Sequence, residues 1–159
     1  MNLPITTWLN GLGAIINFII GLGMCIYFLS QFFKTKKKLQ PWVALFGFTI
    51  ATNYSGPTLT FLSLLIREVN ITELQLYYIS YWLLPGQLIS MLWIGFSVFA
   101  EEKRNQVFIA GLITAILFYL HFFLFPNQSY ELPPGKDWEY FNENGLLLDI
   151  AFKGALRWF

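Results

Sequence analysis

The side chains best placed for chemistry lie beside two glycine-proline pairs within long apolar stretches. One stretch contains Gly56-Pro57 and the next contains Pro85-Gly86. A proline inside a helix lacks an amide donor and blocks the hydrogen bond to the carbonyl four residues earlier, so Asn53 and Tyr81 should carry freed backbone carbonyls. Inside a membrane such carbonyls need polar partners. The pairs therefore predict two neighbouring helix breaks, either packed against other helices or lining a small polar cavity.

Residues near these breaks, with one amide from the first apolar stretch, are candidates to line such a cavity or a solute path. These candidates are Asn53, Ser55, Gly56, Pro57, Pro85, Gly86, Gln87 and Asn17. Each apolar stretch also carries small or polar residues at steps of three and four, such as Asn10, Ala14 and Gly21, which places them on one helix face. Close helix packing explains these faces. An interior that also holds water, an ion or a ligand would explain them as well.

His121 is the only histidine of the chain and lies near the end of the fourth apolar stretch. It could be a proton or ligand contact, or an interfacial residue that reaches water beside Tyr119 and Phe122. Cys25 is the only cysteine, which excludes a disulfide framework and a thiolate metal cluster. The chain has no HExxH, no GxSxG and no glycine-rich phosphate loop. We therefore expect no catalytic, metal-binding or cofactor-binding residues.

The composition indicates the elements that must position these side chains. Of the 159 residues, 56% are hydrophobic and only 12% are charged, whereas a soluble domain carries roughly 25% charged residues. This composition is typical of an integral membrane protein. A net charge of +1, with no basic stripe along one face, excludes a nucleic-acid partner.

Four apolar stretches are long enough to cross a hydrocarbon core of ~30 Å as helices: residues 8–33, 42–66, 76–100 and 106–125. They contain no Asp, Glu, Lys or Arg. Helix start signals agree with them, because Pro41 suits a first helical turn, Thr72 and Gln75 form a capping box, and Asn105 could cap the last helix. We predict an all-α integral membrane protein, a four-helix transmembrane bundle over residues 1–125.

Charge asymmetry predicts the orientation of the chain. Basic residues follow the first apolar stretch at 34 and 36–38, while none precede it, so this loop should be cytoplasmic and the N-terminus extracytoplasmic. Residues 126–144, rich in proline and polar residues, are then an extracytoplasmic loop. Residues 145–159 have an amphipathic helical pattern, which predicts either a helix along the membrane interface or an incomplete fifth span.

Taken together, these patterns predict a non-catalytic multi-pass protein that binds or senses a ligand, or assembles with other proteins, through a polar seam around the broken spans. The alternative is a subunit of an oligomeric facilitator for a small neutral solute, because four spans are few for a path within one chain. The expected partners are the lipid bilayer and either partner transmembrane helices or further copies of the chain.

Overall fold

The computed structural model describes residues 3–132 and 151–152, and this part of the protein is predominantly helical. The helices are α1 (Ile5–Thr35), α2 (Gln40–Arg67), α3 (Glu73–Tyr81), α4 (Leu84–Phe99) and α5 (Arg104–Leu124). Short 3₁₀ turns occupy η1 (Glu101–Lys103) and η2 (Pro126–Gln128), and two short strands are β1 (Tyr130–Glu131) and β2 (Ala151–Phe152).

Three helical segments are long and apolar enough to cross a membrane. They are Ile5–Thr35, Glu73–Phe99, which joins α3 and α4, and Glu101–Leu124. With 28 residues, α2 is also long, but Thr49, Asn53 and other polar residues in its middle make it less apolar. Its crossing of a membrane therefore remains a prediction.

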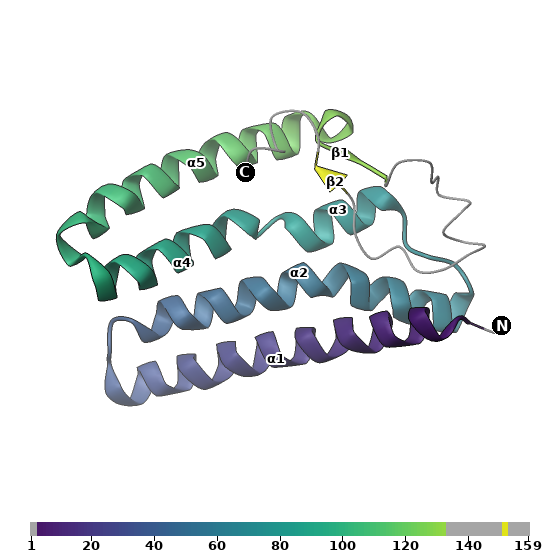
Figure 1. Ribbon diagram of the computed structural model, residues 1–159, viewed down its shortest axis with the longest axis horizontal. Helices are drawn as coiled ribbons and strands as arrows, with labels where there is room; N and C mark the ends of the chain where they lie inside the picture. Colours follow the sequence, from purple (N-terminus) through teal and green to yellow (C-terminus); the bar gives the residue numbers. More distant parts are fainter. Residues whose placement is uncertain (1–2, 133–150, 153–159) are drawn as a thin grey trace.

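The helices lie in a row, in the order of the chain, rather than around a common axis (Figure 1). Extensive contacts join α1 to α2, α2 to both α3 and α4, and α4 to α5, whereas α1 and α5 lie at opposite edges without extensive contact. The sequence predicted a four-helix transmembrane bundle, and the structure arranges its helices as an open row. The physical reason is that the small residues of α1 are concentrated on the face toward α2, while large residues such as Leu12 and Ile16 remain exposed.

The contact between α1 and α2 depends on glycines that let the two backbones approach. A Cβ atom added to Gly21 would lie 2.6 Å from the amide nitrogen of Ala51 and 2.8 Å from the carbonyl oxygen of Gly47. Gly47 is equally confined, because its added Cβ would lie 3.0 Å from the amide nitrogen of Cys25. This is the close approach that small residues permit between membrane helices.

Two of the three predicted helix start signals are confirmed. Thr72 and Gln75 form the capping box at the start of α3, and Pro41 lies in the first turn of α2. The prediction for Asn105 is wrong, since α5 already begins at Arg104 and its N-cap is Lys103. The 3₁₀ turn η1 leads directly into α5, which leaves no extended residue at the position where a capping side chain acts.

The two prolines have different effects on the helices, so the predicted matched pair of breaks is only partly correct. α2 is continuous from Gln40 to Arg67 with Pro57 inside it. The third apolar stretch is divided at Trp82 and Leu83, and Pro85 lies in the first turn of α4. A proline is tolerated there because the first turn of a helix makes no use of its amide hydrogen.

The strands β1 and β2 pair antiparallel, with Tyr130 opposite Phe152 and Glu131 opposite Ala151. Ala151 and Phe152 are thus extended, where the sequence predicted an amphipathic helix. Pairing supplies backbone hydrogen-bond partners to β1, which the helical alternative would leave without them. The predicted loop (126–144) is described only as far as Leu132. Apart from Ala151 and Phe152, the predicted terminal segment (145–159) lies outside the described residues.

A candidate binding cleft beside the junction of α3 and α4

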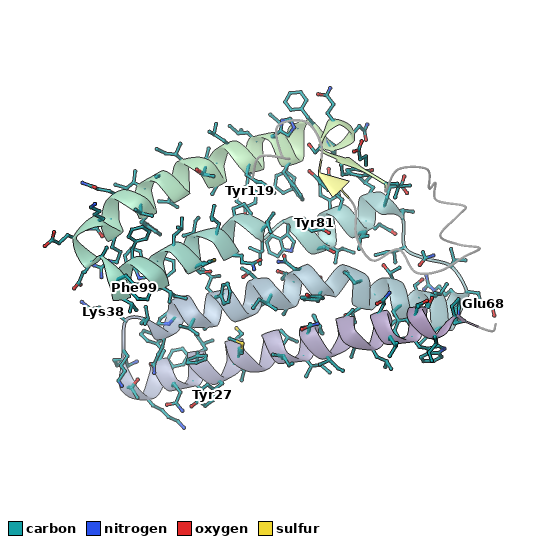
Figure 2. All side chains as sticks on the ribbon, viewed as in Figure 1. Tyr27, Lys38, Glu68, Tyr81, Phe99 and Tyr119 are labelled. Atoms are coloured by element: carbon teal, nitrogen blue, oxygen red, sulfur yellow. The ribbon has the colours of Figure 1, made fainter. Side chains whose placement is uncertain are left out.

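A cleft of about 840 Å³ lies between α1, α2 and the junction of α3 with α4. Its lining comes from the first half of α1, the middle of α2 and the two residues that flank the α3–α4 junction. These residues are Leu9, Asn10, Gly13, Ala14, Asn17, Ile50, Asn53, Tyr54, Pro57, Tyr81 and Gln87. Tyr81 marks this position in Figure 2. The volume is within the range of roughly 300–1,000 Å³ that is usual for small-molecule sites.

The polar groups of the cleft are uncharged. Four lining residues carry carboxamides, Asn10, Asn17, Asn53 and Gln87, and Tyr54 and Tyr81 carry phenols. None of the lining residues is acidic, basic or a histidine. A cleft of this kind can donate and accept several hydrogen bonds, but it offers no partner to an ionised ligand.

One hydrogen bond joins α2 to α4 across the cleft wall. Nδ2 of Asn53 donates to Oε1 of Gln87 at 2.5 Å, over a separation of 34 residues in sequence. Oδ1 of Asn53 is buried and has no hydrogen-bond partner among the described protein groups. A buried polar atom without a partner costs about 1–3 kcal/mol, so a donor that reaches this oxygen would be favoured.

The carboxamides on α1 are held differently. Nδ2 of Asn17 donates to the carbonyl of Gly13, one turn earlier, at 2.9 Å. This bond orients the Asn17 side chain without tying α1 to another helix. Asn10 is exposed and precedes Asn17 by seven residues, which places both on the same face of α1.

The cleft brings together four of the predicted site residues: Asn17, Asn53, Pro57 and Gln87. Pro57 is buried and forms part of the wall. Predicted residues from three separate helices thus lie at one cleft, although the continuous helix around Pro57 was not expected.

The other four predicted cavity residues contribute to helix packing and do not line this cleft. The Ser55 hydroxyl donates to the carbonyl of Thr52 at 2.6 Å and lies 3.3 Å from the carbonyl of Ile79 on α3. Gly56 packs so closely against Ser80 that a Cβ at position 56 would overlap the Ser80 hydroxyl.

Pro85 and Gly86 face other parts of the helical row. Pro85 is buried beside Thr114, Ala115 and Phe118 of α5. Gly86 faces Thr49 of α2, where an added Cβ would lie 3.3 Å from the Thr49 methyl group. Both residues thus allow α4 to pack against its neighbours, which is the packing alternative that the sequence left open.

His121 lies in the last turn of α5 and does not line the cleft. Its ring centroid is 5.5 Å from that of Phe125, and its Nε2 atom is buried without a hydrogen-bond partner among the described residues. The structure therefore separates His121 from the other predicted site residues.

Sequence reasoning did not select Asn10, Tyr54 or Tyr81 as site residues. Asn10 shares a helix face with Asn17, which was a usable signal. Tyr81 precedes Pro85 by four residues, but its position near the end of an apolar stretch favoured an interfacial anchor. Tyr54 follows Asn53 directly and gave no periodic signal.

Among residues 3–132, 151 and 152, no three His, Cys, Asp or Glu side chains are grouped as metal ligands would be. No protein family, curated protein or solved structure was found to be similar to this chain.

Proposed function

We propose that the protein is a non-catalytic, multi-pass membrane protein that binds a small uncharged ligand in the cleft and transmits its occupancy through α2 and α4. The observation that carries this proposal is the convergence of four carboxamides from α1, α2 and α4 on one cleft whose described lining residues are all uncharged. A site of this composition has groups for recognition, and its described lining residues include no carboxylate, imidazole or thiol for acid-base, nucleophilic or metal chemistry.

The exposed surface supports membrane insertion. Large apolar side chains cover the outer faces of the helices, as at Ile16, which is 56% exposed, and Ile116, which is 59% exposed. Such continuous apolar surface is unfavourable in water and suited to lipid. Because α2 packs along α1 after a connection of only four residues, 36–39, α2 should cross the membrane with it.

The charged residues support the proposed orientation. Figure 2 places Lys38 and Phe99 at one end of the helical row and Glu68 at the opposite end. The end near Lys38 carries Lys34, Lys36, Lys37, Lys38, Lys103 and Arg104, against Glu101 and Glu102. The rule that cytoplasmic loops are rich in Lys and Arg then assigns this end to the cytoplasm and the N-terminus to the outside.

An aromatic cluster at the basic end fits the same orientation. The rings of Trp42 and Trp93 are stacked with centroids 4.7 Å apart, and the Arg104 guanidinium lies 4.7 Å from the Trp93 centroid. Trp and Arg combine apolar and polar surface, as residues at the lipid headgroup level do. The cluster would hold α2, α4 and α5 together at this level.

The bond between Asn53 and Gln87 supports a sensing role. It joins α2 to α4 next to the interruption at Trp82 and Leu83. A ligand that accepts from Asn53 Nδ2 or donates to Gln87 Oε1 would compete with it. The ligand would then bind with different affinity when the Asn53–Gln87 bond is formed and when it is broken. Such a difference in affinity is required for a ligand to shift the equilibrium between two positions of α4.

A subunit of an oligomeric facilitator for a small neutral solute is the second candidate. It is favoured by the open row, since α1 and α5 do not enclose a path by themselves and further copies could complete one. Uptake of a neutral solute into proteoliposomes would separate this role from binding alone.

The binding proposal can be tested by thermal unfolding of the full chain with a panel of uncharged probes: glucose, maltose, hexanamide and 1-octanol. At least one probe should raise the unfolding temperature in a saturable way, and Asn53→Leu and Gln87→Leu should abolish the rise. Asn105→Leu, an exposed amide far from the cleft, should retain it. Failure of every probe, or equal stabilisation of Asn53→Leu, would contradict the proposal.

A further inference from the structure

We infer that the ligand of the cleft is a neutral polyhydroxylated group, that is, a sugar ring, either free or as the headgroup of a glycolipid. This inference rests on the proposed binding function and specifies its ligand class.

The hydrogen-bonding chemistry of the lining matches hydroxyl groups. A carboxamide offers two donors and an acceptor oxygen, and a hydroxyl both donates and accepts. Asn53 illustrates the match, because its donor is used by Gln87 while its oxygen has no protein partner among the described residues. A hydroxyl can donate to such an oxygen, once a shift of the surrounding side chains exposes it to the cleft, and still accept from a neighbouring amide.

The distribution of these groups indicates a ligand with several polar atoms. Asn10 and Asn17 are seven residues apart on α1, which corresponds to about 10 Å along the helix axis. Asn53 and Gln87 contribute from α2 and α4. A ligand with a single alcohol or amide would satisfy one of these positions, whereas the hydroxyls around one or two sugar rings reach several.

The remaining lining offers apolar surface for the carbon faces of a sugar. Tyr54 and Tyr81 contribute aromatic rings with a phenol at one end, and Leu9 and Ile50 contribute aliphatic surface. Leu9 is 65% exposed and Tyr54 is 38% exposed, so the rim is open. A headgroup could therefore enter while an attached acyl chain stays outside the cleft.

The described lining residues carry no charge, which disfavours ionised sugars as ligands. A carboxylate or phosphate within the cleft would lose its hydration without a cationic partner among the lining residues. Glucuronate, which resembles glucose but carries a carboxylate, is for this reason a matched negative probe.

The test is thermal unfolding of the full chain in a polyoxyethylene detergent, because maltoside or glucoside detergents would themselves present a sugar to the cleft. Methyl glucoside, maltose and glucosyl diacylglycerol are the probes, with glucuronate and diacylglycerol as their controls. We expect a sugar-bearing probe to raise the unfolding temperature by about 2–4 °C near saturation, and its control to have no effect. Stabilisation by free sugars identifies a solute as the source, and stabilisation by the glycolipid alone identifies a lipid headgroup.

Two variants make the result specific to the cleft. Asn53→Leu should lose the shift, and so should Asn17→Ala. The Asn17 side chain donates to the carbonyl of Gly13 on its own helix, so its removal leaves the α2–α4 bond intact. Asn105→Leu should keep it. If sugars fail while hexanamide or 1-octanol stabilises the protein through Asn53, the sugar inference is overturned and the binding function stands. If no probe acts through Asn53 or Asn17, both are overturned.

Discussion

At the scale of single residues, the polar character of the cleft comes mainly from four carboxamides in an apolar setting. Asn53 and Gln87 were predictable because each lies within four residues of a glycine-proline pair, where a helix has freed polar groups. Their direct bond was not predictable. The two residues are 34 positions apart in sequence, and the distance between them depends on how α2 and α4 pack. Asn10 and Tyr81 have the same limitation, because their roles depend on which helix faces them.

The bond between Asn53 and Gln87 can be measured by a double-mutant cycle. We expect Asn53→Ala, Gln87→Ala and the double variant to give a coupling energy of about 0.6 kcal/mol, the average for hydrogen bonds between membrane helices. Reversible unfolding in mixed micelles provides the free energies. A coupling energy of zero would show that the two side chains do not stabilise each other.

At the scale of elements, the contact between α1 and α2 makes a sharp prediction. Gly21→Ala should destabilise the protein by about 1–3 kcal/mol, because its Cβ would collide with the Ala51 and Gly47 backbones. Gly23→Ala is the matched control on the same helix, since an added Cβ there meets nothing within 4 Å. It should be neutral or slightly stabilising, and equal effects of the two variants in chemical unfolding would refute the close contact.

The contact between α2 and α3 has an analogous dependence on a small residue. Gly56→Ala should destabilise the protein, because the new methyl group would overlap the Ser80 hydroxyl. Gly95→Ala, for which the structure shows open space, is the control. Pairing Gly56→Ala with Ser80→Gly should recover part of the lost unfolding free energy, and no recovery would indicate that another contact is responsible.

The element boundaries follow from local signals to different degrees. The capping box at Thr72 and the proline at position 41 act within one turn, so the sequence located both. The continuity of α2 through Pro57 could not be predicted in this way, because it depends on burial of that residue against neighbouring helices. The same proline-based reasoning placed the interruption near Pro85 but not at Trp82 and Leu83.

At the scale of the whole molecule, hydropathy predicted the helical content and the apolar segments but not the open row. Apolar faces suit lipid and partner helices equally well, so composition does not determine which faces are covered. The structure shows α1 and α5 at separate edges (Figure 1). The cleft lies between α1, α2 and the junction of α3 with α4. The open row is the physical basis for proposing that lipids or further copies of the chain contact these edges.

The proposed orientation is testable in a chain with Cys25→Ala, which removes the only cysteine. Lys36→Cys and Gln128→Cys should react with an impermeant maleimide from opposite sides of sealed vesicles, because these residues lie at opposite ends of the helical row in the proposed topology. Reaction of both from the same side would contradict the orientation.

The most direct test of the central claim measures whether the cleft is polar and accessible in a bilayer. In the Cys25→Ala chain, Asn17→Cys places a thiol in the cleft lining, and Ile16→Cys places one on the exposed apolar face of the same helix. The account predicts that a small, neutral, water-soluble thiol reagent modifies Asn17→Cys and leaves Ile16→Cys unmodified in vesicles. If Asn17→Cys is as unreactive as Ile16→Cys, the region is a packed or lipid-filled seam and the cleft does not serve as a polar binding site.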